Sequence, residues 1–326
     1  FWLVLKGQYI QFMSIPTKED FIKAHDQIKP YIHQTPVLTS SAIDAMCGNQ
    51  LYFKCENFQK MGAFKMRGAT NAILNLSKEQ LEKGVVTHSS GNFAQALSLA
   101  AKNIGIKAFI VMPSSAPKVK QDAVLGYGGL ITICKPTLKA REKASLKIQQ
   151  ETGATFIHPS NDIDVIKGQG TVAYELILEE DDLDYIITPV GGGGLIAGTC
   201  LFTNAFSPST KVIGAEPFEV DDAFRSLISG KIETNLTANT IADGLKTQLG
   251  NVNFPIIQKH VNQIIRVSED EIIEAMKLIY ERMKLIIEPS SAVAFAAVLK
   301  SKEVFKNKKI GIILSGGNVE LTKLPF

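Results

Sequence analysis

A run of four glycines after an apolar segment has the composition of an anion-binding turn. Residues 185–190 are apolar and β-branched, which is typical of a buried parallel strand, and residues 195–202 favour a helix. The glycines between them would let backbone N–H groups converge where the helix dipole favours negative charge. The sequence therefore predicts a phosphate site at 191–194, with a flexible turn as the alternative. The spacing is neither G-x-G-x-x-G nor G-x-x-x-x-G-K-S/T, which disfavours a dinucleotide or a P-loop triphosphate.

Lys65 is the residue best suited to covalent chemistry. It follows Gly62 and lies in the first turn of a helix expected from about residue 64 to 76. The helix dipole disfavours an ammonium group in that position. An amine that loses its proton readily can form an imine with an aldehyde. On composition alone, an ordinary surface lysine is the simpler explanation.

Polar or glycine-rich residues also follow three other predicted strands, at 89–92, at Glu216 and at 315–318. In open α/β sheets, ligands bind beyond the carboxyl ends of the strands. We therefore expect these segments and the glycine run to face one crevice.

Strands and helices alternate with short connections from about residue 84 onward, which predicts parallel, doubly wound sheets. We expect an α/β fold with two open-sheet domains: a small one at 84–159, and a large one formed by 13–83 and 160–326. Thr17 is expected to cap a first helix, and Ser268 with Glu271 to form a capping box. Residues 1–12 are expected to be a disordered extension.

Composition narrows the class of protein. The formal net charge is +3 without a basic run, so we expect no nucleic-acid partner. The four cysteines lie far apart, which favours a reducing, cytoplasmic compartment. No apolar run reaches about 18 residues, so we expect no membrane span.

Four motifs, in this order and at these distances, resemble the fold-type II pyridoxal-phosphate enzymes, within them the serine racemase and serine/threonine dehydratase branch. They are Ala63-Phe64-Lys65-Met66-Arg67-Gly68-Ala69, Ser89-Ser90-Gly91-Asn92, Gly191-Gly192-Gly193-Gly194 and Ser315-Gly316-Gly317-Asn318. The resemblance covers nearly all of residues 14–320. It implies a tryptophan synthase β-like fold, pyridoxal 5'-phosphate in the cleft between the domains, a mobile small domain and a homodimer.

The resemblance also implies roles in holding the cofactor. Lys65 would be the Schiff-base lysine, Phe64 would pack against the ring, Asn92 would bond its hydroxyl, and Ser315 would meet the pyridine nitrogen. Glu288 could approach the cofactor or only cap the helix from Ser290. The implied cofactor-binding residues are Phe64, Lys65, Asn92, Gly191, Gly192, Gly193, Gly194, Leu195, Glu288, Ser315 and Gly316.

Ser89, Ser90, Gly91 and Asn92 would bind the carboxylate of a small hydroxy amino acid. Ser90 also stands where racemases of this branch place a second acid/base on the face opposite Lys65. A plain carboxylate or turn hydrogen bond is the alternative role for Ser90. Phe93 stands where relatives usually have His, which could alter substrate choice.

A divalent-cation site is implied as well. The carboxylates of Glu216 and Asp222, with the carbonyl of Val220, resemble the cation site of this branch. Oxygen ligands suit Mg²⁺, Ca²⁺ or Mn²⁺. The alternative is an acidic helix N-terminus, which the helix dipole also favours.

From these features we expect α,β-elimination of L-serine or L-threonine to a 2-oxo acid and ammonia, with serine racemase activity. The alternative is a 3-hydroxyaspartate dehydratase, which would need one more cation in the pocket, with Arg141 as the candidate. A β-replacement enzyme is a third reading, which the acidic 216–222 cluster disfavours. From a different class, the chain could be a non-catalytic pyridoxal-phosphate-binding protein, but Lys65 together with Ser90 argues against it.

Overall fold

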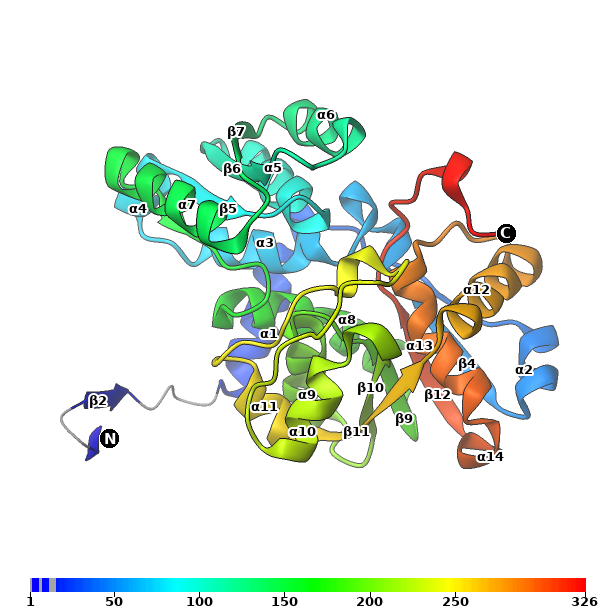
Figure 1. Ribbon diagram of the computed structural model, residues 1–326. Helices are drawn as coiled ribbons and strands as arrows, with labels where there is room; N and C mark the ends of the chain where they lie inside the picture. The colour runs from blue at the N-terminus through cyan, green and yellow to red at the C-terminus, as the bar shows by residue number, and fades with distance from the viewer. Residues whose placement is uncertain (1, 6–7, 12–15) are drawn as a thin grey trace.

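The computed structural model describes residues 2–5, 8–11 and 16–326. The main body contains two open sheets with helices on their faces (Figure 1). The strands are β1 (Trp2–Leu5), β2 (Gln8–Gln11), β3 (Val37–Leu38), β4 (Gln50–Cys55), β5 (Val85–His88), β6 (Ala108–Pro113), β7 (Leu130–Cys134), β8 (Thr155–Phe156), β9 (Tyr185–Pro189), β10 (Lys211–Pro217), β11 (Val261–Val267) and β12 (Lys309–Leu314). The helices are α1 (Lys18–Ile28), α2 (Ser41–Cys47), α3 (Lys65–Leu74), α4 (Lys78–Lys83), α5 (Asn92–Ile104), α6 (Lys118–Gly126), α7 (Leu138–Thr152), α8 (Ile163–Glu179), α9 (Gly194–Phe206), α10 (Asp222–Ser229), α11 (Phe254–His260), α12 (Glu269–Leu278), α13 (Pro289–Lys300) and α14 (Lys302–Phe305).

The larger sheet has the strand order β11-β10-β9-β12-β4-β3. All neighbouring pairs are parallel except β3 with β4. The central strands β9 and β12 are buried along nearly their whole length, because α12 and α13 cover one face and α8 and α9 the other. This burial on both faces explains why their sequences are continuous apolar runs rather than alternating ones.

The smaller sheet has the order β7-β6-β5-β8, and all its pairs are parallel. One face packs on α5, and the other packs on α7. Helix α3 contacts both α5 and α8, so it joins the two sheets. The two open parallel sheets confirm the predicted α/β class, whereas the domain limits and the mobility of the small unit stay predictions.

The two predicted helix caps are confirmed. Thr17 caps α1, and Ser268 with Glu271 forms the expected capping box at α12. Helix α12 ends at Leu278 and passes into a π-helix, Ile279–Met283. The π-helix ends at Lys284, whose φ of 60° reverses the chain.

Two short strands precede the main body. β1 and β2 pair antiparallel over Trp2–Leu5 and Gln8–Gln11, in the segment for which the sequence predicts disorder. That prediction also covers residues 1, 6–7 and 12, which lie outside the described residues.

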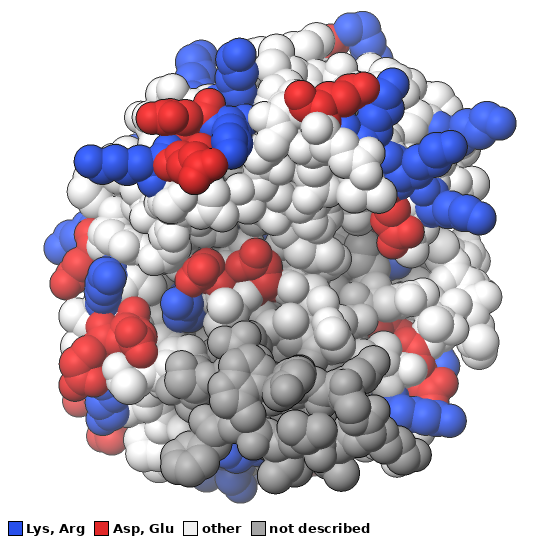
Figure 2. All heavy atoms as spheres, turned by 90° about the vertical axis from the view of Figure 1, so that its left-hand side faces the viewer, with Lys and Arg blue, Asp and Glu red and all other residues white. Residues whose placement is uncertain are grey.

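On the face shown in Figure 2, Lys and Arg side chains are interspersed with Asp and Glu side chains. Within the described ranges, none of the helices has both the length and the apolar composition needed to cross a membrane.

A buried ion cluster attaches α3 to its neighbours. The Arg67 guanidinium donates to both oxygens of Glu56 at 2.8 Å and to both oxygens of Glu175 at 2.7 Å. Lys54 Nζ lies 2.9 Å from Glu175 Oε2. Burial alone would raise the pKa of Glu175, but the charge of Arg67, hydrogen bonds from His25 and Arg67, and the charge of Lys54 hold it below its usual value. Arg67 thereby ties α3 both to the end of β4 and to α8.

We predict that Glu175→Ala lowers the free energy of unfolding by about 3–5 kcal/mol, because Arg67 and Lys54 would keep their buried charges without this partner. Urea unfolding measures the change. Glu79→Ala is the control, since Glu79 pairs with Lys83 at 2.6 Å on the surface and its loss should barely matter. Equal effects of the two substitutions would contradict the role assigned to the cluster.

Candidate active site

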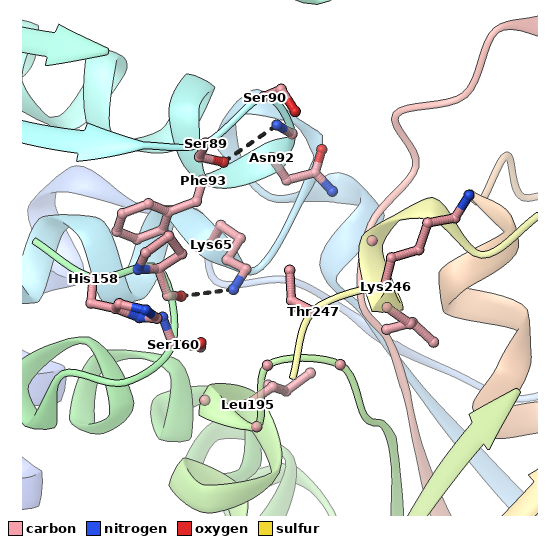
Figure 3. Close-up of a pocket in the computed structure, with 18 of the residues that line it drawn as sticks. Lys65, Ser89, Ser90, Asn92, Phe93, His158, Ser160, Leu195, Lys246 and Thr247 are labelled. Carbon is pink, nitrogen blue, oxygen red and sulfur yellow. Dashed lines mark hydrogen bonds between the residues drawn. The ribbon is translucent and has the colours of Figure 1, made fainter. Parts of the chain in front are cut away.

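A cavity of about 890 Å³ is lined by residues that follow strands of both sheets (Figure 3). Most of the predicted cofactor and substrate residues line it: Phe64, Lys65, Ser89, Ser90, Gly91, Asn92, Gly191, Gly192, Gly193, Gly194, Leu195, Glu288 and Ser315. Gly316 lies behind this wall, and the predicted cation ligands Glu216, Val220 and Asp222 lie outside the cavity. The carboxyl ends of β5, β9 and β12 thus meet at one site, as expected for parallel sheets. Glu216, at the end of β10, does not line this cavity, so its expected place in the same crevice is wrong.

Lys65 is placed at the start of α3 by a sharp turn. Met61 and Gly62 have φ values of 56° and 77°, which reverse the chain just before the helix. Lys65 Nζ donates to the carbonyl oxygen of Pro159 at 2.9 Å, and it lies 4.9 Å from the centroid of the Phe64 ring. Burial lowers the pKa of Lys65 to about 8, although the charge of Glu288 opposes the shift. A neutral amine is therefore accessible near physiological pH.

The glycine turn is built as an anion cradle. Gly193 has a φ of 80° and precedes α9, and no side chain caps the helix. Within the part of the chain that the structure describes, the N–H groups of Gly191 through Leu195 donate to no backbone or side-chain acceptor. A Cβ on Gly192 would lie 2.5 Å from Ser160 Oγ, so no larger residue fits at position 192 without moving Ser160. Converging N–H groups at a helix N-terminus fit a phosphate.

Asn92 joins the two sides of the cavity. Its Nδ2 donates to both carboxylate oxygens of Glu288 at 3.0 Å, and its Oδ1 accepts from Asn318 Nδ2 at 3.0 Å. Burial raises the pKa of Glu288 to about 7, while the hydrogen bond from Asn92 acts in the opposite direction. The Glu288 carboxylate makes no side-chain cap bond to α13 and instead accepts from Asn92.

Ser315 lies at the end of β12. Its carbonyl accepts the Phe64 N–H at 3.0 Å, and its hydroxyl lies 3.1 Å from Ser291 Oγ. A neutral hydroxyl at this place can share a hydrogen bond with a ring nitrogen without supplying a negative charge. Gly316 supports it from behind by donating to Ser291 Oγ at 2.7 Å.

Ser89 and Ser90 belong to the loop between β5 and α5. Ser89 Oγ accepts from the Gly91 N–H at 3.3 Å. Figure 3 shows Ser90 just before the start of α5, above Lys65. The role of Ser90 as a second acid/base stays a prediction.

Several lining residues have no recognisable pattern in the sequence. Lys246, Thr247 and Gln248 come from an irregular segment after the 3₁₀ turn Asp243–Leu245, which has no periodicity to place it. Asp243 Oδ2 lies 2.5 Å from Lys120 Nζ, so this segment is bonded to α6. His158 follows β8 by two residues, so the rule that ligands bind beyond strand ends could have identified it.

The predicted cation ligands form a separate buried group. Glu216 accepts the N–H groups of Ala223 and Phe224 at 3.1 and 2.9 Å, and Asp222 Oδ2 accepts that of Leu249 at 3.0 Å. Asp222 Oδ1 is buried and has no partner among the described residues. Burial raises the pKa of both carboxyls, that of Asp222 to about 6, and the charge of Asp222 raises that of Glu216 further.

These features suit a cation. Two buried carboxylates, one of which has an oxygen without a hydrogen-bond partner among the described residues, favour a positive charge between them. No cluster of three His, Cys, Asp or Glu side chains suited to a metal occurs among the described residues. Hence the carbonyl of Val220 and water would have to complete the ligands.

We predict that Lys65 is acetylated by acetic anhydride at a rate that rises with pH and is half-maximal near pH 8. The protein is first freed of any bound aldehyde, so that the amine is unmodified. The amine reacts only when neutral, and desolvation lowers the pKa of Lys65 to about 8. Peptide mass spectrometry gives the rate. Glu288→Gln should lower the midpoint, because the Glu288 carboxylate favours the ammonium form. A midpoint near the ordinary value of 10.5 would contradict the burial of the amine.

Comparison with known proteins agrees with this geometry. Residues 28–316 match the family described as "Pyridoxal-phosphate dependent enzyme". The chain is 50% identical over 314 residues to a beta-hydroxyaspartate dehydratase of Paracoccus denitrificans (strain Pd 1222), covering 96% of this chain and 100% of that protein. It is 52% identical over 318 residues to a serine racemase of Dictyostelium discoideum, covering 96% and 98% of the two chains.

The solved structures give the same result. A crystal structure of serine racemase from Dictyostelium discoideum is similar with a TM-score of 0.91 and 52% identity, covering 94% of this chain and 100% of that one. The family match includes all the cavity-lining residues from Phe64 to Ser315. This chain therefore belongs to the pyridoxal-phosphate dependent enzymes.

Proposed function

We propose that this chain catalyses the α,β-elimination of L-serine and L-threonine to a 2-oxo acid and ammonia, and that it also interconverts the serine enantiomers. The observation that carries the proposal is that one cavity holds the amine of Lys65, the free N–H groups of the glycine turn and the loop 89–92. Relatives named serine racemase support it.

Pyridoxal phosphate, when bound, supplies an aldehyde for the substrate amine and a conjugated ring that accepts the electron pair of a broken bond to Cα. The N–H groups of Gly191 through Leu195 would hold its phosphate, and Lys65 would be the amine that tethers it. Phe64 would lie beside the ring, and Ser315 would meet its nitrogen.

Lys65 then acts as the base that removes the Cα proton from its own side of the substrate. Its lowered pKa keeps a fraction of the amine neutral, and the apolar rings of Phe64 and Phe93 exclude water from it. The loop at Ser89–Asn92 would hold the substrate carboxylate through its N–H groups and hydroxyls. Loss of the Cα proton and the β-hydroxyl, followed by hydrolysis, gives the 2-oxo acid and ammonia.

Ser90 would return a proton to Cα from the opposite side, which inverts the configuration. Its place in the lining of the same cavity as Lys65, on a different loop, supports this role. Elimination needs only Lys65 as base, whereas racemisation needs both residues.

We predict that the enzyme forms 2-oxo acid from L-serine and L-threonine, and that Lys65→Ala lowers kcat by at least about 10²–10⁴-fold because it removes the base. The assay follows 2-oxo acid and the serine enantiomers together. Ser90→Ala should abolish racemisation while elimination from L-serine persists. Turnover of L-serine by Lys65→Ala at the rate of the unmodified enzyme would refute the assignment.

Elimination from 3-hydroxyaspartate is the second candidate function. Arg141 of α7 lines the cavity, and among the described residues its buried Nε has no hydrogen-bond partner. Burial and the charge of Arg141 both lower the pKa of His88, which also lines the cavity. An available guanidinium matches a second substrate carboxylate, and the Paracoccus denitrificans relative is named a beta-hydroxyaspartate dehydratase.

The same assay with the threo-3-hydroxyaspartates separates the two functions. Arg141→Leu should lower kcat/KM for hydroxyaspartate by about 30-fold or more, equivalent to about 2 kcal/mol, and change that for L-serine far less. Lys139→Leu is the control, because Lys139 is an exposed cation on the same helix outside the cavity. Parallel loss with both substrates would exclude Arg141 as the side-chain ligand.

We further propose that Glu216, Asp222 and the Val220 carbonyl bind Mg²⁺, Ca²⁺ or Mn²⁺. The support is the orphan Oδ1 of Asp222 and the two raised carboxyl pKa values. Asp222 also accepts the Leu249 N–H, so a cation would stabilise the segment that brings Thr247 to the cavity.

We predict that a chelator lowers the melting temperature and the activity together, and that added Mg²⁺, Ca²⁺ or Mn²⁺ restores both. In Asp222→Asn the chelator should have no further effect, since one ligand charge is already gone. Unchanged melting and activity of the unmodified enzyme after chelation would remove the cation from the proposal.

A further inference from the structure

One backbone carbonyl receives two side-chain donors at the base of the cavity. Pro159 lies in the turn between β8 and α8, and its carbonyl oxygen accepts Lys65 Nζ at 2.9 Å (Figure 3). The same oxygen accepts Gln169 Nε2 at 3.3 Å. A carbonyl has two lone pairs, so both bonds can form together.

Gln169 has no exposed surface and is wedged between the two helices that begin at the site. A Cβ on Gly68 of α3 would lie 2.8 Å from its Cγ, and a Cβ on Gly194 of α9 would lie 2.5 Å from its Oε1. Both helices therefore depend on glycine to make room for this side chain. Its position is set by the helix of Lys65 and by the glycine turn at once.

The turn that carries the carbonyl is held independently. His158 Nδ1 accepts the N–H groups of Ser160 and Asn161 at 3.2 and 2.8 Å. Burial, with the nearby charges of His88 and Lys65, lowers the pKa of His158 to about 4, so the ring remains a neutral acceptor. Asn253 Nδ2 donates to the carbonyls of Ser160 and Gly192 at 3.1 and 2.8 Å. The Pro159 carbonyl is thus a rigid acceptor beside the glycine turn.

We propose that Gln169 is a positioning residue, which together with the Pro159 carbonyl orients the Lys65 amine for proton exchange with the substrate Cα. The proposal rests on the function of Lys65 proposed above. One N–H of the Lys65 amine donates to one lone pair of the Pro159 carbonyl, and Gln169 Nε2 occupies the other lone pair of that carbonyl. The amine can therefore bond the carbonyl in only one position. This hydrogen bond fixes the direction of the lone pair on the neutral amine, which would otherwise rotate freely.

The test compares Gln169→Met with the unmodified holoenzyme. We expect kcat for elimination from L-serine to fall by about 10–100-fold, the size of effect that a small misplacement of a catalytic group produces. KM, bound cofactor measured by absorbance, and melting temperature should change little. With α-deuterated L-serine, the isotope effect on kcat should increase, because proton removal becomes slower relative to other steps.

A second variant keeps the shape of the side chain. Gln169→Glu cannot donate to the carbonyl when ionised, and it places a carboxylate near Lys65. The acid limb of the kcat–pH profile should shift to higher pH by about one unit or more. This readout remains informative if the methionine variant folds poorly.

Gln121→Met is the matched control, because Gln121 Nε2 also donates to a backbone carbonyl, that of Ala116 at 2.9 Å, without touching Lys65. It should leave kcat, the isotope effect and the pH profile unchanged. If the unmodified enzyme turns over L-serine and Lys65→Ala does not, the proposed function holds. In that case an unchanged isotope effect in Gln169→Met, or an unshifted profile in Gln169→Glu, would overturn the positioning role alone.

Discussion

The geometry of the site depends on how Arg67 is held. Its guanidinium faces two carboxylates, Glu56 at the end of β4 and Glu175 in α8, and has no exposed surface. Buried ion pairs of this kind contribute less to stability than their short distances suggest, because desolvation of the charges is costly. Their directional bonds still fix the helix that carries Lys65 against both neighbours. Arg67 lies two positions after Lys65 in α3, which is less than one helical turn.

The glycine turn and Lys65 lie in different electrostatic environments. The glycine turn presents N–H groups and a helix N-terminus, which attract an anion. Lys65 lies in a desolvated place beside the rings of Phe64 and Phe93, which disfavours its cationic form. A cofactor with an anionic phosphate at one end and an aldehyde at the other suits both.

The sequence was sufficient for features that depend on local rules. An apolar strand, four glycines and a helix predict the cradle, and the N–H groups of Gly191 through Leu195 have no protein acceptor among the described residues. Lys65 was identified by its place at a helix start and by the motif around it. The contact of Asn92 with Glu288 was not predicted, because 196 residues separate them and nothing local relates the two. The irregular segment with Lys246 and Thr247 also lacked any pattern.

Residue types and spacing were enough to predict the α/β class and the residues that could do chemistry, because strand ends, glycine turns and caps follow from short-range sterics and hydrogen bonding. Which of these groups meet depends on the fold. The Pro159 carbonyl became the acceptor for Lys65, and Asp222 became bonded to the segment over the cavity, through packing of distant elements. Backbone carbonyls and N–H groups occur at nearly every residue, so their side-chain partners are set by the fold and cannot be read from residue type.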